Sequence, residues 1–284
     1  MSGAATAGDY NSLPDILPTE LSEYPLKEFV AMFCDIGRIF RSRQRDPNIA
    51  STLTELEWET ELKFVRLFRE FFGDIPMVTE EHMNRLGRTI PGTGPISAVL
   101  DPLDGSLSYM SGSPRYTCTM AVKKHGSPIF GLVYRPATEE VFLAVAGGGA
   151  YRGRERLYAP LVSRRSPLVS VKSQIRDVPE VAALTRRLRA AGYHTERMES
   201  TSLKLCWTAQ RRRAGIVKSL RSRHGVLCDW GTAAGLLICQ EAGLRPLTLD
   251  GGMWRPATGG LMVGEGPHAA HAAGLYAERA SDAR

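Results

Sequence analysis

The sequence has no apolar run long enough to cross a membrane, and its N-terminus has no charged-then-apolar signal pattern. It also has no internal repeat and no low-complexity block, which argues against a repeat architecture. These absences predict a globular, cytoplasmic protein without a membrane partner. At 284 residues the chain is long enough for one large domain or for two lobes that share an interface.

Cysteine is scarce, and no two cysteines have the paired spacing of a metal site. Their number is odd, which does not suit a disulfide framework. Most lie within apolar runs, so we interpret all five as reduced core residues: Cys34, Cys118, Cys206, Cys228 and Cys239.

The charge balance is basic, with a formal net charge of +6 that comes mainly from clusters of arginine. The clusters lie at 41–45, 152–156, 186–189 and 211–223. They either attract an anionic, phosphorylated substrate or are ordinary solvated surface. Aromatic residues are not interleaved with these arginines as they are in single-strand binders, so no nucleic-acid partner is predicted.

The most informative stretch is Val99–Ser106, with the sequence V-L-D-P-L-D-G-S. An apolar run predicts a buried strand that ends at Pro102, since proline interrupts ladder pairing. Asp101 and Asp104 then lie three residues apart on a turn, where their charges repel unless a cation lies between them. Oxygen ligands suit Mg²⁺, and Gly105 and Ser106 offer groups that suit a phosphate. The alternative is an ordinary turn with solvated carboxylates.

Periodicity and turn residues predict a mixed succession of helices and strands. The expected helices are 26–41, about 54–72 (capped by Ser51 or Thr52), 178–191, 203–214, 230–242 (stopped by Gly243) and 268–279. The expected strands are 77–78, 96–100, 116–122, 129–134, 141–145, 150–151, 168–171 and 260–264, with those from 116 to 151 forming an antiparallel sheet. We therefore predict an α+β protein with a loose tail (1–20), an N-terminal lobe (21–165) and a C-terminal lobe (166–284).

A pair of glutamates, Glu80 and Glu81, follows the short strand 77–78. Such a pair is either a set of exposed turn charges or a source of metal ligands. The loop 84–94 can return the chain beside the next strand. Glu80, Asp101 and Asp104 would then cluster at neighbouring strand ends.

Taken together, these motifs resemble those of the inositol monophosphatase superfamily of Mg²⁺-dependent, Li⁺-sensitive phosphatases. The resemblance covers the chain from about Leu26 onward and rests on Glu80-Glu81, on D-P-L-D-G-S at 101–106, on W-G-T-A-A-G at 230–235 and on E-A-G at 241–243. Within the superfamily, S-L-K-L-C at 202–206 with Ala209 is most similar to the signature of 3′(2′),5′-bisphosphate nucleotidases.

The resemblance implies a layered α-β-α-β-α fold with the site between the two lobes. It implies that Glu80, Asp101 and the carbonyl of Leu103 hold a first Mg²⁺, and that Asp101 and Asp104 hold a second. The implied catalytic residues are Glu57, Glu81 and Ser106. The implied substrate contacts are Gly105, Ser106, Ser202 and Lys204.

Three departures from the family pattern bear on activity. The aspartate that follows tryptophan in the family is Gly231 here, and Asp229 either replaces it as a metal ligand or lies in solvent. If the segment is extended, residues 229 and 231 point to the same side. The family's water-activating aspartate and threonine correspond to Glu57 and Ser106, between which the hydrogen bond can survive. Asp46-Pro47-Asn48 replaces a run of lysine and aspartate.

These observations predict a Mg²⁺-dependent phosphatase acting on a small phosphomonoester, either a nucleotide 3′-phosphate or a sugar or inositol phosphate, with a weakened second metal site. The alternative is a silent or repurposed relative that binds a phosphorylated ligand without hydrolysing it. A homodimer is left open.

Overall fold

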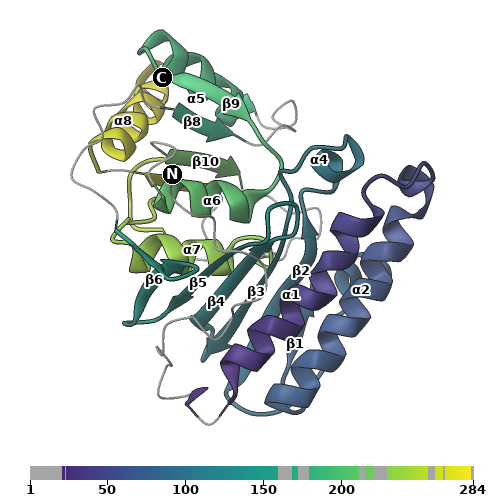
Figure 1. The fold of residues 1–284 in the computed structure, drawn as a ribbon. Helices are drawn as coiled ribbons and strands as arrows, with labels where there is room; N and C mark the ends of the chain where they lie inside the picture. Colours follow the sequence, from purple (N-terminus) through teal and green to yellow (C-terminus); the bar gives the residue numbers. More distant parts are fainter. Residues whose placement is uncertain are drawn as a thin grey trace.

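The computed structural model describes residues 21–22, 24–158, 168–171, 179–210, 215–219, 229–254, 260–264 and 266–282. Within these residues the chain forms five layers (Figure 1). Helices α1 and α2 cover one face of a seven-stranded sheet, and α6 and α7 cover its other face. A four-stranded sheet follows, and α5 and α8 close the stack. The α+β class and the α-β-α-β-α layering are thus confirmed.

The first layer is a pair of amphipathic helices, α1 (Leu26–Arg43) and α2 (Ile49–Phe72). Buried aromatic side chains join them, and the rings of Phe33 and Phe64 stack at 4.3 Å. Helix α2 begins five residues earlier than expected, after Asn48. Ser51 and Thr52 therefore lie inside its first turn, and their hydroxyls donate to the carbonyl of Asn48 instead of capping the helix.

The larger sheet has the order β1-β2-β3-β4-β5-β6-β7, and the predicted hairpins are confirmed. Only β1 and β2 pair in parallel; the other neighbours are antiparallel. The strands are β1 (Met77–Thr79), β2 (Ile96–Asp104), β3 (Thr117–Lys124), β4 (Ser127–Arg135), β5 (Glu140–Val145), β6 (Gly149–Arg152) and β7 (Glu155–Leu157), with β7 not foreseen. Short helices α3 (Glu80–Leu86) and α4 (Ser106–Met110) follow β1 and β2. Helix α3 extends into the stretch expected to be a loop.

The prediction that Pro102 ends strand β2 is wrong. The strand continues to Asp104, with an irregular register between the pairs Asp101–Thr119 and Asp104–Thr117. Two residues lie between these pairs on β2 and only Cys118 lies between them on β3, so the strand carries an extra residue. Such a bulge accommodates a residue without an N–H donor.

The smaller sheet has the order β11-β10-β8-β9. Its strands are β8 (Leu168–Val171), β9 (His194–Arg197), β10 (Gly215–Ser219) and β11 (Gly260–Gly264), and its neighbouring helices are α5 (Pro179–Ala190), α6 (Thr201–Ala209), α7 (Ala233–Glu241) and α8 (Gly266–Asp282). Strands β8 and β11 have the predicted bounds, whereas β9 and β10 were not foreseen. Helix α7 begins three residues later than expected, and residues 211–214 of the expected helix 203–214 lie outside the described residues.

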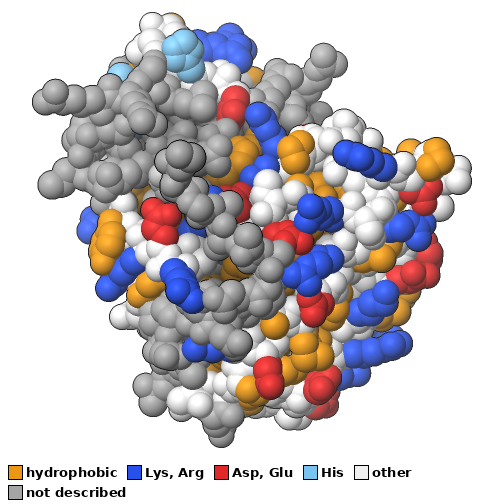
Figure 2. Space-filling model, in the orientation of Figure 1, with side chains coloured by type: hydrophobic (Ala, Val, Ile, Leu, Met, Phe, Trp, Pro, Cys, Tyr) orange, Lys and Arg blue, Asp and Glu red, His pale blue; other side chains and the backbone are white. Residues whose placement is uncertain are grey.

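The surface shown in Figure 2 carries basic and acidic side chains in close mixture beside α1 and α2. Several arginines of this region have acidic partners, as in the pairs Arg41–Glu139 and Arg43–Asp46. Asp46 also accepts the N–H of Asn48 at 2.9 Å and so shapes the turn before α2. In the part of the chain that is described, no helix is long and apolar enough to span a bilayer.

Candidate functional site

Strand pairing brings Glu80 and Asp101 together. Strands β1 and β2 are parallel, with Thr79 opposite Leu100, so that the next residues along the two segments are Glu80, the first residue of α3, and Asp101 on β2. Asp101 is 4 % exposed, and Glu80 is half-buried. Burial first, and then the charge of Glu80 and a hydrogen bond with it, raise the pKa of Asp101 well above its usual value. The two carboxyl groups therefore meet in a hydrogen bond.

Asp101 and Asp104 both lie on the last, bulged part of β2, and the turn expected between them comes only after Asp104, at Gly105. The Asp101 carboxylate accepts the backbone N–H of Leu103 at 3.0 Å, which fixes its orientation. Gly105 has φ of 109°, in the left-handed region, and an added Cβ would lie 3.0 Å from the carbonyl oxygen of Arg115. Only glycine allows the chain to turn here and to enter α4 at Ser106.

Glu57 on α2 reaches this turn from the other side. The Ser106 hydroxyl donates to Glu57 Oε1 at 2.6 Å and lies 3.1 Å from the carbonyl oxygen of Leu103. The hydrogen bond expected between Glu57 and Ser106 is thus present. Burial first, and then the charges of Glu81 and Glu80, raise the pKa of Glu57 to about 8 against the bond from Ser106. Burial and Glu80 likewise raise the pKa of Glu81 to about 7.

Asp104 is turned toward the start of α6. Its Oδ2 accepts the Ser200 hydroxyl at 2.8 Å, the Ser202 N–H at 2.7 Å and the Ser202 hydroxyl at 2.5 Å. Its Oδ1 accepts the Thr201 N–H at 3.1 Å. An oxygen with three donors has no lone pair left for a cation. Oδ1 is therefore the oxygen of Asp104 that can still coordinate a cation.

Gly231 lies directly against these carboxylates. A Cβ at residue 231 would be 3.2 Å from Asp101 Oδ2 and 3.8 Å from Asp104 Oδ1. A side chain here would thus reach the same two carboxylates that the sequence assigns to a second cation. Glycine supplies no ligand atom.

Asp229 does not take the place of the missing carboxylate. Its side chain forms an ion pair with Lys123 on β3, which lies opposite Ser97, four residues before Asp101 along β2. The argument from an extended segment also fails, because Thr232 and Ala233 donate their N–H groups to the Asp229 carbonyl in a turn. In this structure Asp229 is thus paired with Lys123 and is not seen in the predicted role of a ligand.

Ser202 and Lys204, which the resemblance assigns to the substrate, are both fully buried. Ser202 binds Asp104 and lies 2.6 Å from the Thr117 hydroxyl. The Lys204 ammonium donates to the carbonyl of Met198 at 2.8 Å. Both side chains thus hold the start of α6 in this structure, and their contact with a substrate stays a prediction.

The oxygen atoms at this site are of the kind that bind a hard cation. Glu80 and Asp101 are in contact and Asp104 lies near them, and burial first, and then the charges of Glu80 and Asp104, raise the pKa of Asp101. Carboxylate and carbonyl oxygens are the ligands that Mg²⁺ takes. Among the described residues, however, no three or more His, Cys, Asp or Glu side chains are arranged as a complete cation site. The structure thus brings Glu80 to Asp101 and Asp104 near it, and leaves their joint ligation a prediction.

Two features of the site were not foreseen from the sequence. Glu61 is fully buried and accepts hydrogen bonds from the segment that carries Glu80. Its spacing of four residues from Glu57 places both on one helix face and was the available signal. Ser200 caps α6 and binds Asp104; a serine just before a helix was the corresponding signal.

Comparisons with known proteins agree with this arrangement. Residues 38–283 match the model of the inositol monophosphatase family. The Nus factor SuhB of Pasteurella multocida is 30% identical over 206 residues, which cover 70% of this chain and 73% of that protein. The inositol-1-monophosphatase of Rhizobium meliloti is 29% identical over 195 residues, which cover 66% and 69% of the two chains.

Solved structures share the fold. The crystal structure of inositol monophosphatase II from Staphylococcus aureus superposes with a TM-score of 0.76 at 19% identity, over 91% of this chain and 97% of that one. At this identity the likeness concerns the fold alone.

Proposed function

The chain belongs to the inositol monophosphatase family, and from that premise we propose that it is a Mg²⁺-dependent phosphatase that hydrolyses a small phosphomonoester. The observation that carries the proposal is the contact of Asp101 with Glu80, next to the Ser106–Glu57 hydrogen bond. A cation and a water-positioning pair are what phosphate hydrolysis needs, since its catalysis is mostly positioning and electrostatics.

In this proposal Glu80, Asp101 and the carbonyl of Leu103 hold the cation. Bound there, the cation neutralises phosphoryl charge and lowers the pKa of the attacking water. Ser106 donates its proton to Glu57, so the lone pairs of its oxygen are available to a water hydrogen. Glu57 and Ser106 thereby orient the water, Glu81 adds a second carboxyl group beside them, and Gly105 and Ser106 receive the phosphate. No covalent link between enzyme and phosphate is needed.

The substrate is a nucleotide 3′-phosphate or a sugar or inositol phosphate. The S-L-K-L-C signature supports the first, and the named activity of the Rhizobium relative supports the second. The test is a phosphate-release screen over bisphosphonucleotides, nucleoside monophosphates, inositol phosphates and sugar phosphates, with Mg²⁺ or with chelator. Activity that is independent of Mg²⁺ would contradict the proposal.

Asp101→Asn is the matching variant. It keeps the shape of the side chain but removes the charge that meets Glu80, so we expect Mg²⁺-dependent phosphate release to be lost. The exposed Asp74→Asn is the control and should keep wild-type turnover. Unchanged turnover in Asp101→Asn would remove Asp101 from the proposed site.

A second candidate is a relative that binds a phosphorylated ligand without hydrolysing it. The observation that favours it is Gly231, which lies against Asp101 and Asp104 without a ligand atom. The naming of one relative as a Nus factor is compatible with a role other than catalysis. Binding of a phosphorylated compound by calorimetry, with no phosphate released at any Mg²⁺ concentration, would support this candidate.

A further inference from the structure

Glu61 is a fully buried carboxylate to which the proposed mechanism gives no role. It lies on α2, one helical turn after Glu57, so that both side chains leave the same face of the helix. A buried carboxylate is costly unless donors surround it. The donors around Glu61 therefore identify the segment that this carboxylate stabilises.

Three donors and the ring of His82 converge on Glu61, and all come from the short segment 79–82. Oε1 accepts the Thr79 hydroxyl at 2.8 Å and the His82 N–H at 2.9 Å, and lies 2.8 Å from His82 Nδ1. Oε2 accepts the Glu81 N–H at 2.7 Å. Both oxygens are thus bound to the junction of β1 and α3, on either side of Glu80.

Glu61 caps the N-terminus of α3 in place of the N-cap residue. Thr79 is the N-cap residue, but its side chain makes no capping bond to its own helix. Its hydroxyl goes to Glu61, and the first N–H groups of α3 go there too. The negative charge is also favourable at a helix N-terminus. A residue 18 positions away in the sequence therefore sets where α3 begins.

The same junction determines whether Glu80 can meet Asp101. The parallel register ends with Thr79 opposite Leu100, and Glu80 is the first residue of α3. The His82 ring is held from its other side by Trp58, at 4.9 Å between ring centroids. Thr79 and His82, the residues that flank the pair Glu80-Glu81, are thus both anchored on α2.

We propose that Glu61 is a positioning residue that fixes the β1–α3 junction so that Glu80 meets Asp101 at the cation site. This inference rests on the proposed function, because it concerns the same cation. It adds a residue that would contact neither cation nor substrate and would act through the backbone of Glu81 and His82.

The test is Mg²⁺ binding by calorimetry in the absence of substrate, on wild type, Glu61→Gln and Glu59→Gln. Glutamine keeps the shape and one acceptor oxygen of Glu61, but its amide nitrogen cannot accept the Glu81 N–H. We expect Mg²⁺ affinity to fall about tenfold or more in Glu61→Gln, the range seen when groups behind metal ligands are changed. Glu59 is exposed on the same helix, and its variant should bind as wild type does.

Thr79→Val is the second variant, since it removes one donor and leaves the buried carboxylate in place. We expect about a tenfold loss of Mg²⁺ affinity, in line with the lower end of the range for one hydrogen bond to a charged group. Circular dichroism and the melting temperature in chelator report the fold. If Glu61→Gln does not fold, the Mg²⁺ affinity of Thr79→Val tests the inference.

Folded variants that bind Mg²⁺ as tightly as wild type would overturn the inference, because loss of stability alone is what a purely structural role predicts. If wild type itself binds no Mg²⁺, the proposed function fails first and the inference fails with it. The two failures are therefore distinguishable.

Discussion

At the scale of single residues, Gly231 decides how a second cation would be held. Its backbone lies against Asp101 and Asp104, and Asp104 Oδ2 is saturated by donors from α6. A cation here would have Asp101 and Asp104 Oδ1 as carboxylate ligands, with water or substrate oxygens in the remaining positions. We therefore expect the wild type to need high Mg²⁺, or bound substrate, to fill this position.

Gly231→Asp should tighten Mg²⁺ binding and raise phosphate release. One added carboxylate near the cation supplies enough attraction for about a tenfold gain in affinity. The same change should lower the melting temperature in chelator, because a third negative charge would lie a few ångströms from Asp101. Calorimetric Mg²⁺ titration and thermal melts measure the two effects.

Gly231→Ala controls for the added Cβ, which is 3.2 Å from Asp101 Oδ2 in this structure. Asp229→Ala controls for the neighbouring carboxylate and should leave Mg²⁺ affinity unchanged, since Asp229 pairs with Lys123. The account of the second cation is wrong if Gly231→Asp changes neither Mg²⁺ binding nor turnover, or if Asp229→Ala weakens Mg²⁺ binding.

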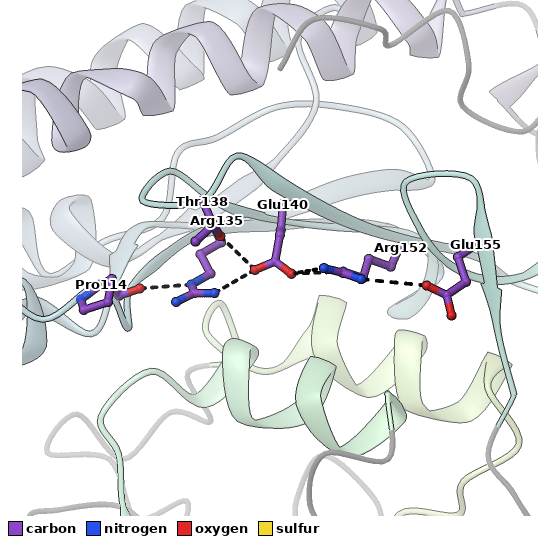
Figure 3. A network of polar contacts seen from close by, with 6 residues as sticks. All are labelled: Pro114, Arg135, Thr138, Glu140, Arg152 and Glu155. Carbon is purple, nitrogen blue, oxygen red and sulfur yellow. Dashed lines mark hydrogen bonds and ion pairs between the residues drawn. The ribbon is translucent and has the colours of Figure 1, made fainter. Parts of the chain in front are cut away.

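At the scale of elements, a polar network joins strands β4, β5 and β6 behind the site (Figure 3). Glu140 accepts Arg135 Nη1 and the Thr138 hydroxyl, each at 2.7 Å, on one oxygen, and two nitrogens of Arg152 on the other. Burial alone would raise the pKa of Glu140, but these donors outweigh it and lower the pKa. Arg135 also lies over the ring of Trp207 on α6, at 5.4 Å, and so ties the sheet to the layer behind it.

Glu140→Gln should destabilise the fold by about 2 kcal/mol, because it leaves two partly buried arginines without their shared anion. The melting temperature should fall by about 5 °C at neutral pH. Glu155→Gln is the control, since Glu155 is exposed and touches Arg152 only at 3.8 Å. Melts at pH 7 compare the two, and equal melting temperatures for wild type and Glu140→Gln would contradict the assigned role.

The sign of the pH dependence follows from the lowered pKa of Glu140. Its contribution is present above the unfolded-state pKa and is lost as the pH falls through the folded-state value. The difference between wild type and Glu140→Gln should therefore shrink in acid.

At the scale of the whole molecule, several carboxyl groups gather at one site of a chain whose net charge is +6. Without a cation, the pKa is raised to about 8 for Glu57 and to about 7 for Glu81. The ordinary pKa of both glutamates is 4.5. Between pH 4.5 and these raised pKa values, the folded state therefore holds more protons than the unfolded state. The contribution of these two glutamates to stability is therefore fully present below the unfolded-state pKa. It is lost as the pH rises through the folded-state pKa.

In chelator, the free energy of unfolding should therefore decrease from pH 5.5 to pH 8, by up to about 1.4 kcal/mol per pH unit for each carboxylate. Mg²⁺ should reverse the loss, and its effect should be larger at pH 8, because a positive charge beside Glu57 and Glu81 favours their ionised forms. Denaturant titrations at both pH values, with Mg²⁺ or chelator, measure this. Glu57→Gln should flatten the slope, and a wild-type stability that does not change with pH in chelator would contradict the prediction.

Local patterns in the sequence determined much of this fold and part of its site. Helical spacing predicted α1, and apolar runs between turn residues predicted β8 and β11 with their observed bounds. Asp101 and Asp104 could be placed close together because they are three positions apart, although both lie on β2 and not on the expected turn. These features depend on neighbours in the chain, whose side chains and backbone preferences can be read directly from the sequence.

Tertiary structure alone decided the partners of the charged groups. Asp229 pairs with Lys123, 106 residues away, and Asp104 binds Ser202, 98 residues away. Glu61 binds the β1–α3 junction, and β2 continues through Pro102 because the extra residue against β3 relieves the pairing. The physical reason is that a buried charge must find donors wherever packing brings them, and packing joins segments whose separation no local pattern records.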